Sequence, residues 1–173
     1  MQDAAGLSEL LRYGTIASVD LAGARCTVEA GDVVSGPIPW IEGRAGATRS
    51  WSPPSVGEQV LLLCPEGDLA GGVALRGIFS DASPAPGDDL RELIRFADGA
   101  VLAYDPQAHH LDVTLPAGAT LAIAADGGST IKGDITLIGK LTASDDVIAA
   151  GISLKSHKHG GVQAGTAQTG TPQ

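Results

Sequence analysis

Residues 133–157 read "GDITLIGKLTASDDVIAAGISLKSH", in which short runs of alternating apolar and polar residues are separated by glycine and aspartate. Such runs predict β-strands, and the glycine and aspartate between them predict turns. Strands this short bury too little apolar surface to make a core by themselves, because a lone meander of them is only marginally stable in water. The stretch therefore predicts strands that are completed by other copies of the chain.

The same pattern extends upstream through "AVLAYDPQ", "HLDVTLPAG" and "ATLAIAADGG", with units that repeat at a spacing of roughly six to ten residues. An intertwined trimer, in which three copies wind their strands about one axis, would bury the inward-facing positions in one narrow shared column. A single-chain parallel β-helix is the rival arrangement, but it normally has longer and more numerous rungs, so the trimer is preferred. The inward-facing candidates are Leu111, Val113, Leu115, Leu121, Ile123, Ile135, Leu137, Ile148, Ile152 and Leu154.

A different pattern precedes these repeats. Five strand-like runs, "YGTIASVD", "ARCTVEA", "DVVSGPIPW", "EQVLLLCP" and "GGVALRGIFS", fall within residues 13–80 and predict a small closed barrel, for which the OB-fold is the common five-stranded solution. The predicted fold is therefore all-β and homotrimeric, an N-terminal OB-fold barrel followed by an intertwined triple-stranded β-helix needle. The predicted parts are a short helical segment (1–12), the OB-fold domain (13–80), a linker (81–90), the needle (91–155) and a metal-binding apex with a fold-back tail (156–173).

The composition supports this architecture. Apolar residues make up 43% of the chain but aromatic residues only 3%, so any core is built from small aliphatic side chains that suit a narrow column. The 24 glycines favour tight turns over long helices. The formal net charge of −9, without clusters of lysine and arginine, argues against a nucleic-acid partner.

Two histidines stand close to the end of the chain, in "SHKHGG" at residues 156–161. Because residues i and i+2 of a strand face the same side, His157 and His159 are expected to project together, with Lys158 on the other face. Alone, this H-x-H motif is a weak metal signal. A three-fold axis at the end of the needle would bring three such pairs together and supply six imidazole nitrogens.

Six neutral nitrogen ligands favour an octahedral transition metal, because zinc prefers four tetrahedral ligands and magnesium and calcium prefer oxygen. Iron(II) is a good candidate, and the ligand type also allows nickel or cobalt. With no coordination position left for water or substrate, the metal would be structural rather than catalytic. No catalytic residue and no small-molecule site are predicted, and the chain is not expected to be an enzyme.

Other candidate residues have simpler interpretations. Adjacent residues of a strand point to opposite faces, so His109 and His110 are interpreted as turn or surface residues, and Asp145 and Asp146 as turn residues rather than a glycosidase pair. Cys26 and Cys64 lack metal-ligand spacing and are predicted to be buried thiols. The aromatic residues Tyr13, Trp40, Trp51 and Phe79 lack the clustered basic neighbours that nucleic-acid binding requires and are interpreted as core anchors and contacts to a protein partner.

The N-terminal stretch "MQDAAGLSELLRYG" has an early acidic residue and no long apolar run, so it is expected to be neither a secretory signal nor a membrane anchor. The protein is accordingly expected to be made in the cytoplasm and to leave by lysis.

The sequence resembles the phage baseplate assembly protein V family, the central spikes of contractile tails. The resemblance lies in "SWSPPSVGEQVLLLCPEGDLAGGVALRGIFSDASPAP" (50–86), in "RFADGAVLAYDPQAHHLDVTLP" (95–116) and, most specifically, in the closing "GISLKSHKHGG" with its Gly- and Thr-containing tail. It implies a homotrimer whose OB-fold domain docks in the baseplate hub beneath the tail tube. It also implies one iron ion at the needle tip, bound by His157 and His159 of three chains, and a spike that is driven through the outer membrane of the target bacterium when the sheath contracts.

Two other functions remain open. A trimeric tail fibre that binds or cleaves a cell-surface polysaccharide should carry a cleft with paired carboxylates or exposed aromatic residues. A metallohydrolase built on His157 and His159 would need a further carboxylate ligand and an open coordination site.

Overall fold

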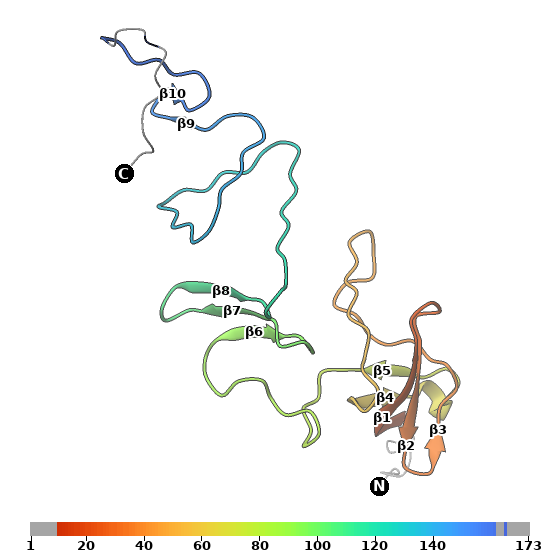
Figure 1. The fold of residues 1–173 in the computed structure, drawn as a ribbon. Coiled ribbons are helices and arrows are strands. Elements are labelled where there is room, and N and C mark those ends of the chain that lie inside the picture. The colour runs from red at the N-terminus through yellow and green to blue at the C-terminus, as the bar shows by residue number, and fades with distance from the viewer. Residues whose placement is uncertain (1–9, 162–164, 166–173) are drawn as a thin grey trace. The chain divides into compact units, whose positions relative to one another are not determined.

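The computed structural model describes residues 10–161 and residue 165, and these described residues are almost entirely strands, turns and extended chain (Figure 1). The nine N-terminal residues of the predicted helical segment lie outside them, and its last two residues belong to the first strand. The prediction of an all-β chain is confirmed for the described residues. Their elements are β1 (Leu11–Asp20), β2 (Arg25–Ala30), β3 (Val33–Val34), β4 (Gln59–Leu63), a 3-10 turn η1 (Pro65–Gly67), β5 (Val73–Leu75), β6 (Glu92–Arg95), β7 (Val101–Asp105), β8 (His110–Thr114), β9 (Ile148–Ala149) and β10 (Ile152–Ser153).

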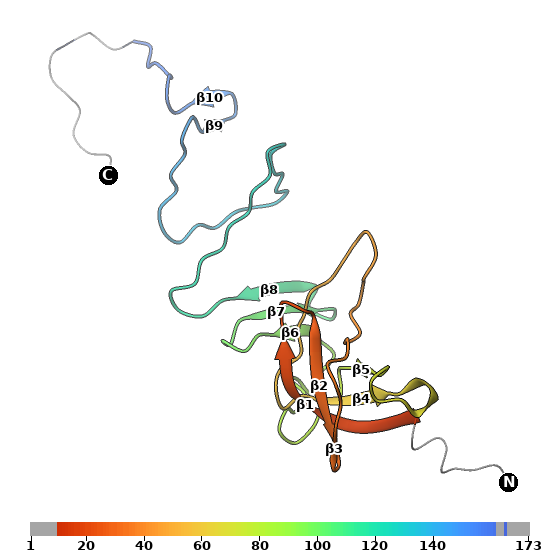
Figure 2. The ribbon, with the colours of Figure 1, turned by 90° about the vertical axis from the view of Figure 1, so that its right-hand side faces the viewer.

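The five N-terminal strands form one antiparallel sheet in the order β3-β2-β1-β4-β5. Figure 2 shows β1 running along both β2 and β4 at the centre of this sheet. Residues 38–41 close the sheet by bridging its two sides. Ile38 exchanges two backbone hydrogen bonds of 2.9 Å with Cys26 of β2. On the other side, the Ala74 N–H of β5 donates to the Pro39 carbonyl, and the Ala74 carbonyl accepts the Ile41 N–H. The result is a small barrel in the region predicted for it.

The predicted strand 32–40 is divided in two. The Ser35 hydroxyl accepts the N–H of Val28 at 2.9 Å and donates to the Gly36 carbonyl at 2.8 Å, so a side chain takes the place of a backbone partner. Pro39 has no N–H to donate, which further limits regular pairing here. The chain consequently leaves β2 after β3 and returns to it at Ile38.

The barrel core is aliphatic and small, as the composition predicted. Strand β4 alternates between partly buried and buried residues, which places Val60 and Leu62 inside. Both cysteines are free and buried, as predicted, and burial raises the pKa of each thiol. Close packing also explains Gly14, where a Cβ would lie 2.5 Å from Val28 Cγ1. The fully buried large side chains are Ile16, Cys26, Val28, Ile38, Val60, Leu62 and Cys64.

A second antiparallel sheet contains β6, β7 and β8, with β7 in the middle. Strands β7 and β8 coincide with the predicted repeat units "AVLAYDPQ" and "HLDVTLPAG". Within one chain this sheet buries little, because Ala103 is its one fully buried strand residue among those described, and every residue of β8 is exposed.

Residues 115–147 contain no strand in the described chain, although several repeat units predict strands there. Contacts divide the chain into a unit ending at Leu121 and a second unit from Ala122 onward, so each is described by itself. In the second unit β9 and β10 pair as a hairpin. Ala150 (φ 50°) and Gly151 (φ 83°) form its turn, and positive φ at both central residues is what a type I′ turn requires. The predicted domain boundaries remain predictions.

Candidate metal centre

The β9–β10 hairpin carries the chain into the two terminal histidines. One carboxylate oxygen of Asp146 accepts backbone N–H groups from Val147 at 2.8 Å and from Lys155 at 3.1 Å, and so joins both ends of the hairpin. The Leu154 N–H also donates to the Val147 carbonyl at 3.0 Å. This closed loop holds the start of the H-x-H segment against the hairpin.

The Asp146 carboxylate is held in its charged form. Hydrogen bonding from the Ser153 hydroxyl, and then from backbone N–H groups including that of Lys155, lowers the pKa of Asp146. Its neighbour Asp145 is exposed and pairs with Lys155 at 2.9 Å. The interpretation of this acidic pair as turn residues is confirmed, since the two carboxylates serve different local contacts.

The backbone carbonyl of Ser153 fixes the ring of His157. It lies 2.9 Å from His157 Nδ1 and also accepts the His157 backbone N–H at 3.2 Å. Because a carbonyl oxygen can only accept, this contact assigns the proton to Nδ1 and leaves the lone pair on Nε2. Histidines that bind metals commonly donate the other ring N–H to a carbonyl or carboxylate in this way.

The two histidine rings lie next to each other. Their centroids are 5.1 Å apart with the planes at 77°, and both rings line an open cavity of about 460 Å³ beside the hairpin. Residues 157–159 form no strand within one chain. Lys158, which was expected on the opposite face, lines the same cavity. The segment therefore presents two imidazole donors side by side.

A single chain supplies only part of a metal site. Among residues 10–161 and 165, no group of three or more His, Cys, Asp or Glu side chains is placed to hold a metal ion. Two imidazoles with one ring already oriented by a carbonyl fit a nitrogen-liganded ion shared between chains. They do not provide the additional carboxylate ligand that a metallohydrolase would need within this part of the chain.

The other two histidines lie elsewhere. The turn between β7 and β8 is closed by the Asp105 carboxylate, which accepts N–H groups from Gln107 at 2.8 Å and Ala108 at 3.1 Å. His109 has φ 52° in this turn, and His110 begins β8; both are exposed. Their interpretation as turn or surface residues is confirmed.

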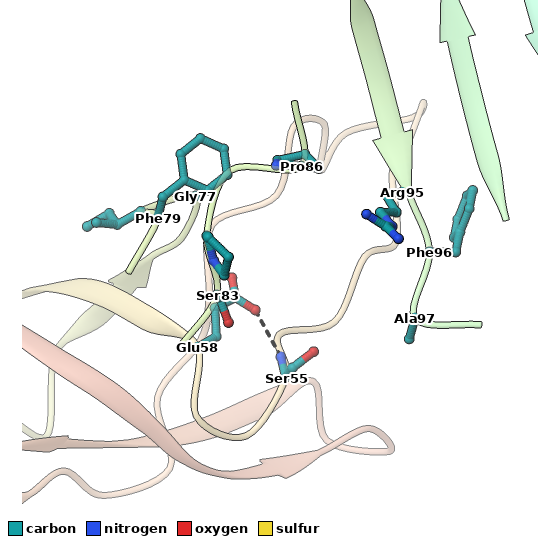
Figure 3. Close-up of a pocket in the computed structure, with 11 residues that line it drawn as sticks. Ser55, Glu58, Gly77, Phe79, Ser83, Pro86, Arg95, Phe96 and Ala97 are labelled. Atoms are coloured by element: carbon teal, nitrogen blue, oxygen red, sulfur yellow. Dashed lines mark hydrogen bonds between the residues drawn. The ribbon is translucent and has the colours of Figure 1, made fainter. Parts of the chain in front are cut away.

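A second cavity, of about 440 Å³, lies in the first unit and is lined mainly by apolar side chains (Figure 3). Phe79, Pro84, Pro86 and Phe96 are among its lining residues. Glu58 supplies the one carboxylate among the described lining residues, and it accepts the Ser55 N–H at 2.9 Å. The cavity lacks the carboxylate pair that glycoside hydrolysis ordinarily uses.

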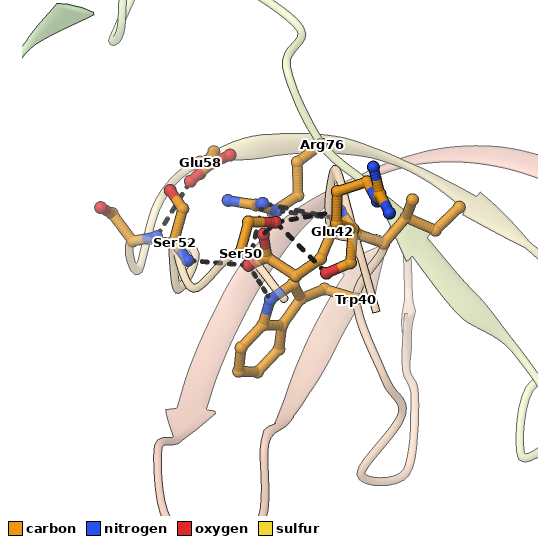
Figure 4. A network of polar contacts seen from close by, with 9 residues as sticks. Trp40, Glu42, Ser50, Ser52, Glu58 and Arg76 are labelled. Carbon is orange, nitrogen blue, oxygen red and sulfur yellow. Dashed lines mark hydrogen bonds and ion pairs between the residues drawn. The ribbon is translucent and has the colours of Figure 1, made fainter. Parts of the chain in front are cut away.

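One polar network was not predictable from sequence spacing. The Glu42 carboxylate accepts hydrogen bonds from the Trp40 indole N–H at 2.9 Å and the Ser52 N–H at 2.8 Å, and Arg76 lies 3.4 Å away (Figure 4). The indole contact is the main cause that lowers the pKa of Glu42. Trp40 is a buried core anchor, as interpreted, whereas Tyr13, Trp51 and Phe79 are exposed.

None of the described residues forms a helix with the length and apolar character that crossing a membrane requires.

Comparison with known proteins matches two segments of the chain to family models. Residues 12–79 match the type VI secretion system/phage-baseplate injector OB domain, and residues 151–173 match the GpV apex motif. The first match identifies the small barrel as an OB-fold, as predicted. The second includes both terminal histidines and extends beyond the described residues.

The chain is also 37% identical over 136 residues to the spike protein of Escherichia phage P2. This alignment covers 78% of the chain but 64% of the phage protein, so the chain spans a little less than two thirds of that relative's length. These are structural proteins of spikes and baseplates rather than enzymes, which agrees with the prediction that the chain is not an enzyme. The predicted family resemblance is confirmed.

Proposed function

We propose, from the premise that the chain belongs to the phage baseplate assembly protein V family, that it is the central spike of a contractile tail baseplate. In this proposal three copies form the spike, the OB-fold domains dock on the baseplate hub and tail tube, and the intertwined needle projects toward the target cell. The protein is assembled in the host cytoplasm, leaves by lysis, and is located in the baseplate of a virion or of a related contractile bacteriocin.

The observation that carries the proposal is the exposure of the needle's apolar side chains in a single chain. All ten inward-facing candidates are exposed, and their exposed fractions range from 39% for Leu115 to 81% for Ile123. Burial of such a side chain contributes about 1.5–3 kcal/mol. Three copies that share one column would bury all of them, and no alternative cover exists within the described part of the chain.

The spike's mechanical role follows from this arrangement. In the needle, residues 115–147, which form no strand within one chain, would pair with other copies, so one chain could not bend away without breaking hydrogen bonds to its neighbours. Sheath contraction would drive this stiff needle through the outer membrane of the target bacterium. An end where the strand pairing stops is the weakest point of such a needle, because unpaired strand ends fray.

A metal ion at the tip would prevent that fraying. Three His157–His159 pairs around the axis would supply six nitrogens, a donor set that suits octahedral iron(II). The contact of His157 Nδ1 with the Ser153 carbonyl supports this role, because it leaves Nε2 to face the ion. The ion would be structural, and it would connect the three chain ends where their strand pairing ends.

A trimeric tail fibre that binds or cleaves a polysaccharide is the alternative. The apolar cavity of the first unit and the exposed Phe79 and Phe96 are the features that favour it, since sugars stack on aromatic rings. Its single carboxylate, however, argues against cleavage. The spike remains the better supported function.

Replacing both tip histidines tests the proposal. His157→Ala with His159→Ala should abolish bound iron, measured by elemental analysis, and should leave a trimer because the shared column holds most of the buried surface. A matched control, His109→Ala with His110→Ala, removes two histidines from a surface turn and should retain the iron. Iron that persists in the first variant would contradict the site, and dissociation to monomers would contradict the dominant role of the column.

A further inference from the structure

Residues 43–51 form an arm that leaves the barrel and returns to it, here called the basic arm. The Glu42 carboxylate fixes its base: it accepts hydrogen bonds from the Ser50 hydroxyl at 2.9 Å and from the Ser52 N–H at 2.8 Å, on the returning side of the arm (Figure 4). Arg44 and Ser50 are also joined through the Ser50 N–H and the Arg44 carbonyl at 2.9 Å. The basic arm is therefore held in place before it meets any partner.

The two arginine side chains of the basic arm have no charged partner within the described chain. Arg44 and Arg49 are exposed and form no ion pair with any described residue. Trp51 packs one side against Trp40, at 5.5 Å between ring centroids, yet remains 59% exposed. Arginine and tryptophan are the residue types that most often dominate protein interfaces.

The charge of the basic arm contrasts with that of the whole chain. Residues 43–57 contain two arginines and no acidic residue, whereas the chain has 20 acidic and 11 basic residues. A rigid segment that exposes two arginines and an indole fits a surface with carboxylates beside an apolar recess.

The same unit carries such a surface. Every residue of the segment 81–92 is exposed, and its acidic members are Asp81, Asp88, Asp89 and Glu92. Within the described chain the segment's one ion pair joins Asp89 to Arg91 at 2.8 Å, so the other three carboxylates are free to attract a partner's charge. The apolar cavity of Figure 3 adjoins the segment, since Pro84 and Pro86 belong to both.

Three-fold assembly requires two different complementary surfaces on each chain. In a ring of three copies each contact is heterologous: one patch on a chain meets another patch on the next, and the rotation closes the ring. The basic arm and the acidic segment are such a pair, opposite in charge and unpaired within one chain. A foreign partner would need only one of them, so the presence of both favours a second copy.

We propose that the basic arm of one copy docks on the acidic segment and adjoining cavity of the next copy. Trp51 enters the apolar cavity, and Arg44 and Arg49 face the carboxylates of Asp81 and Asp88. This inference rests on the proposed homotrimer and adds a collar of contacts around the OB-fold domains, which is independent of the needle column and the metal.

Photo-cross-linking of the full-length protein tests the inference. A photo-reactive amino acid at Ala47, an exposed position of the basic arm, leaves Arg44, Arg49 and Trp51 intact. Irradiation should join two chains, with mass spectrometry placing the second attachment within residues 78–97. The same amino acid at Leu21, which is 59% exposed in the turn between β1 and β2, should give no such product.

Charge reversal provides a second test of the inference. Arg44→Glu with Arg49→Glu should reduce the cross-linked product about tenfold, because like charges then face each other. Adding Asp81→Arg and Asp88→Arg should restore it. Added salt should also reduce the yield of the cross-linked product, since interactions between exposed charges are screened over about 10 Å at 0.1 M.

The molar mass of each sample separates two failures. A trimer that gives only cross-links within one chain, or cross-links elsewhere, would overturn the docking of the basic arm and leave the proposed spike intact. A monomer would overturn the proposed trimer together with this inference.

Discussion

The backbone carbonyl of Ser153 links the hairpin to the candidate metal centre. It accepts hydrogen bonds from His157 Nδ1 and from the His157 backbone N–H. Because the carbonyl belongs to the backbone, no side-chain substitution at position 153 removes this contact. The hydroxyl of Ser153 also helps to hold Asp146 charged, so this one residue contacts both the carboxylate and the candidate metal ligand His157. At this scale the tip is organised before any ion binds.

The pH dependence of the hairpin should depend on Asp146. Its pKa is lower in the folded chain than the ordinary value of 3.8, so its hydrogen bonds contribute full stability above that value. This contribution should be lost as the pH falls through the lowered folded value. We expect the unfolding midpoint of the wild type to fall steeply with acid below about pH 4, and less steeply in Asp146→Asn, as followed by circular dichroism.

Asp145→Asn is the matched control for this comparison, because Asp145 is an exposed neighbour whose contact is an ion pair with Lys155. Exposed pairs contribute about 0–1 kcal/mol. Equal acid sensitivity in Asp146→Asn and the wild type would contradict the assigned role of Asp146. Metal should be released by acid as well, since only neutral imidazoles bind it.

At the scale of elements, the β9–β10 turn is demanding because both of its central residues have positive φ. Glycine adopts this conformation without steric cost, whereas other L-residues lose about 1–2 kcal/mol. Gly151 meets this requirement without steric cost, whereas Ala150 is strained by its positive φ. The hairpin therefore carries strain that its pairing and the Asp146 contacts offset.

Two opposite substitutions should reveal this strain. Gly151→Ala should destabilise the tip by about 1–2 kcal/mol, while Ala150→Asn should stabilise it, since asparagine tolerates this conformation better than alanine. Hydrogen exchange of the tip amides would measure both effects. The same sign of change in both variants would show that the turn adopts another conformation in the assembled protein.

The sequence predicted much of the fold because the relevant signals are local. Runs of β-forming residues with breakers between them predicted the strands of the barrel, as the alternation in β4 shows. His157 and His159 do lie side by side, but not on a strand, so the strand rule predicted their proximity without predicting the local structure. The Glu42 network could not be predicted, because it depends on how the chain turns back between Glu42 and Ser52 and on Arg76, which is distant in the sequence. The division of strand 32–40 was missed for a similar reason: it depends on a hydrogen bond between Ser35 and Val28 on the neighbouring strand.

At the scale of the whole molecule, the described chain contains two kinds of structure. The OB-fold barrel is complete, with buried residues contributed by every one of its long strands. The region predicted as the needle leaves most of its apolar side chains exposed. Such exposure in a region without a core of its own favours an interface, because soluble monomers rarely present extended apolar surface.

Two neighbouring residues test which face of the needle is buried. Leu137 is an inward-facing candidate, whereas the adjacent Ile138, which is 96% exposed, would face the opposite side if this segment forms a strand in the needle. Leu137→Asp should dissociate the trimer or lower its thermal stability sharply, since it places three carboxylates around one axis. Ile138→Asp should have little effect. If Ile138→Asp were the more damaging of the two in light scattering and thermal melts, the predicted register would be wrong.

Molar mass in solution, measured together with bound metal on the same sample, shows whether the protein is a trimer that shares one ion. We expect a particle of three times the chain's 17.4 kDa mass with one iron ion per three chains. A monomeric protein, or a zinc ion in each chain, would contradict it.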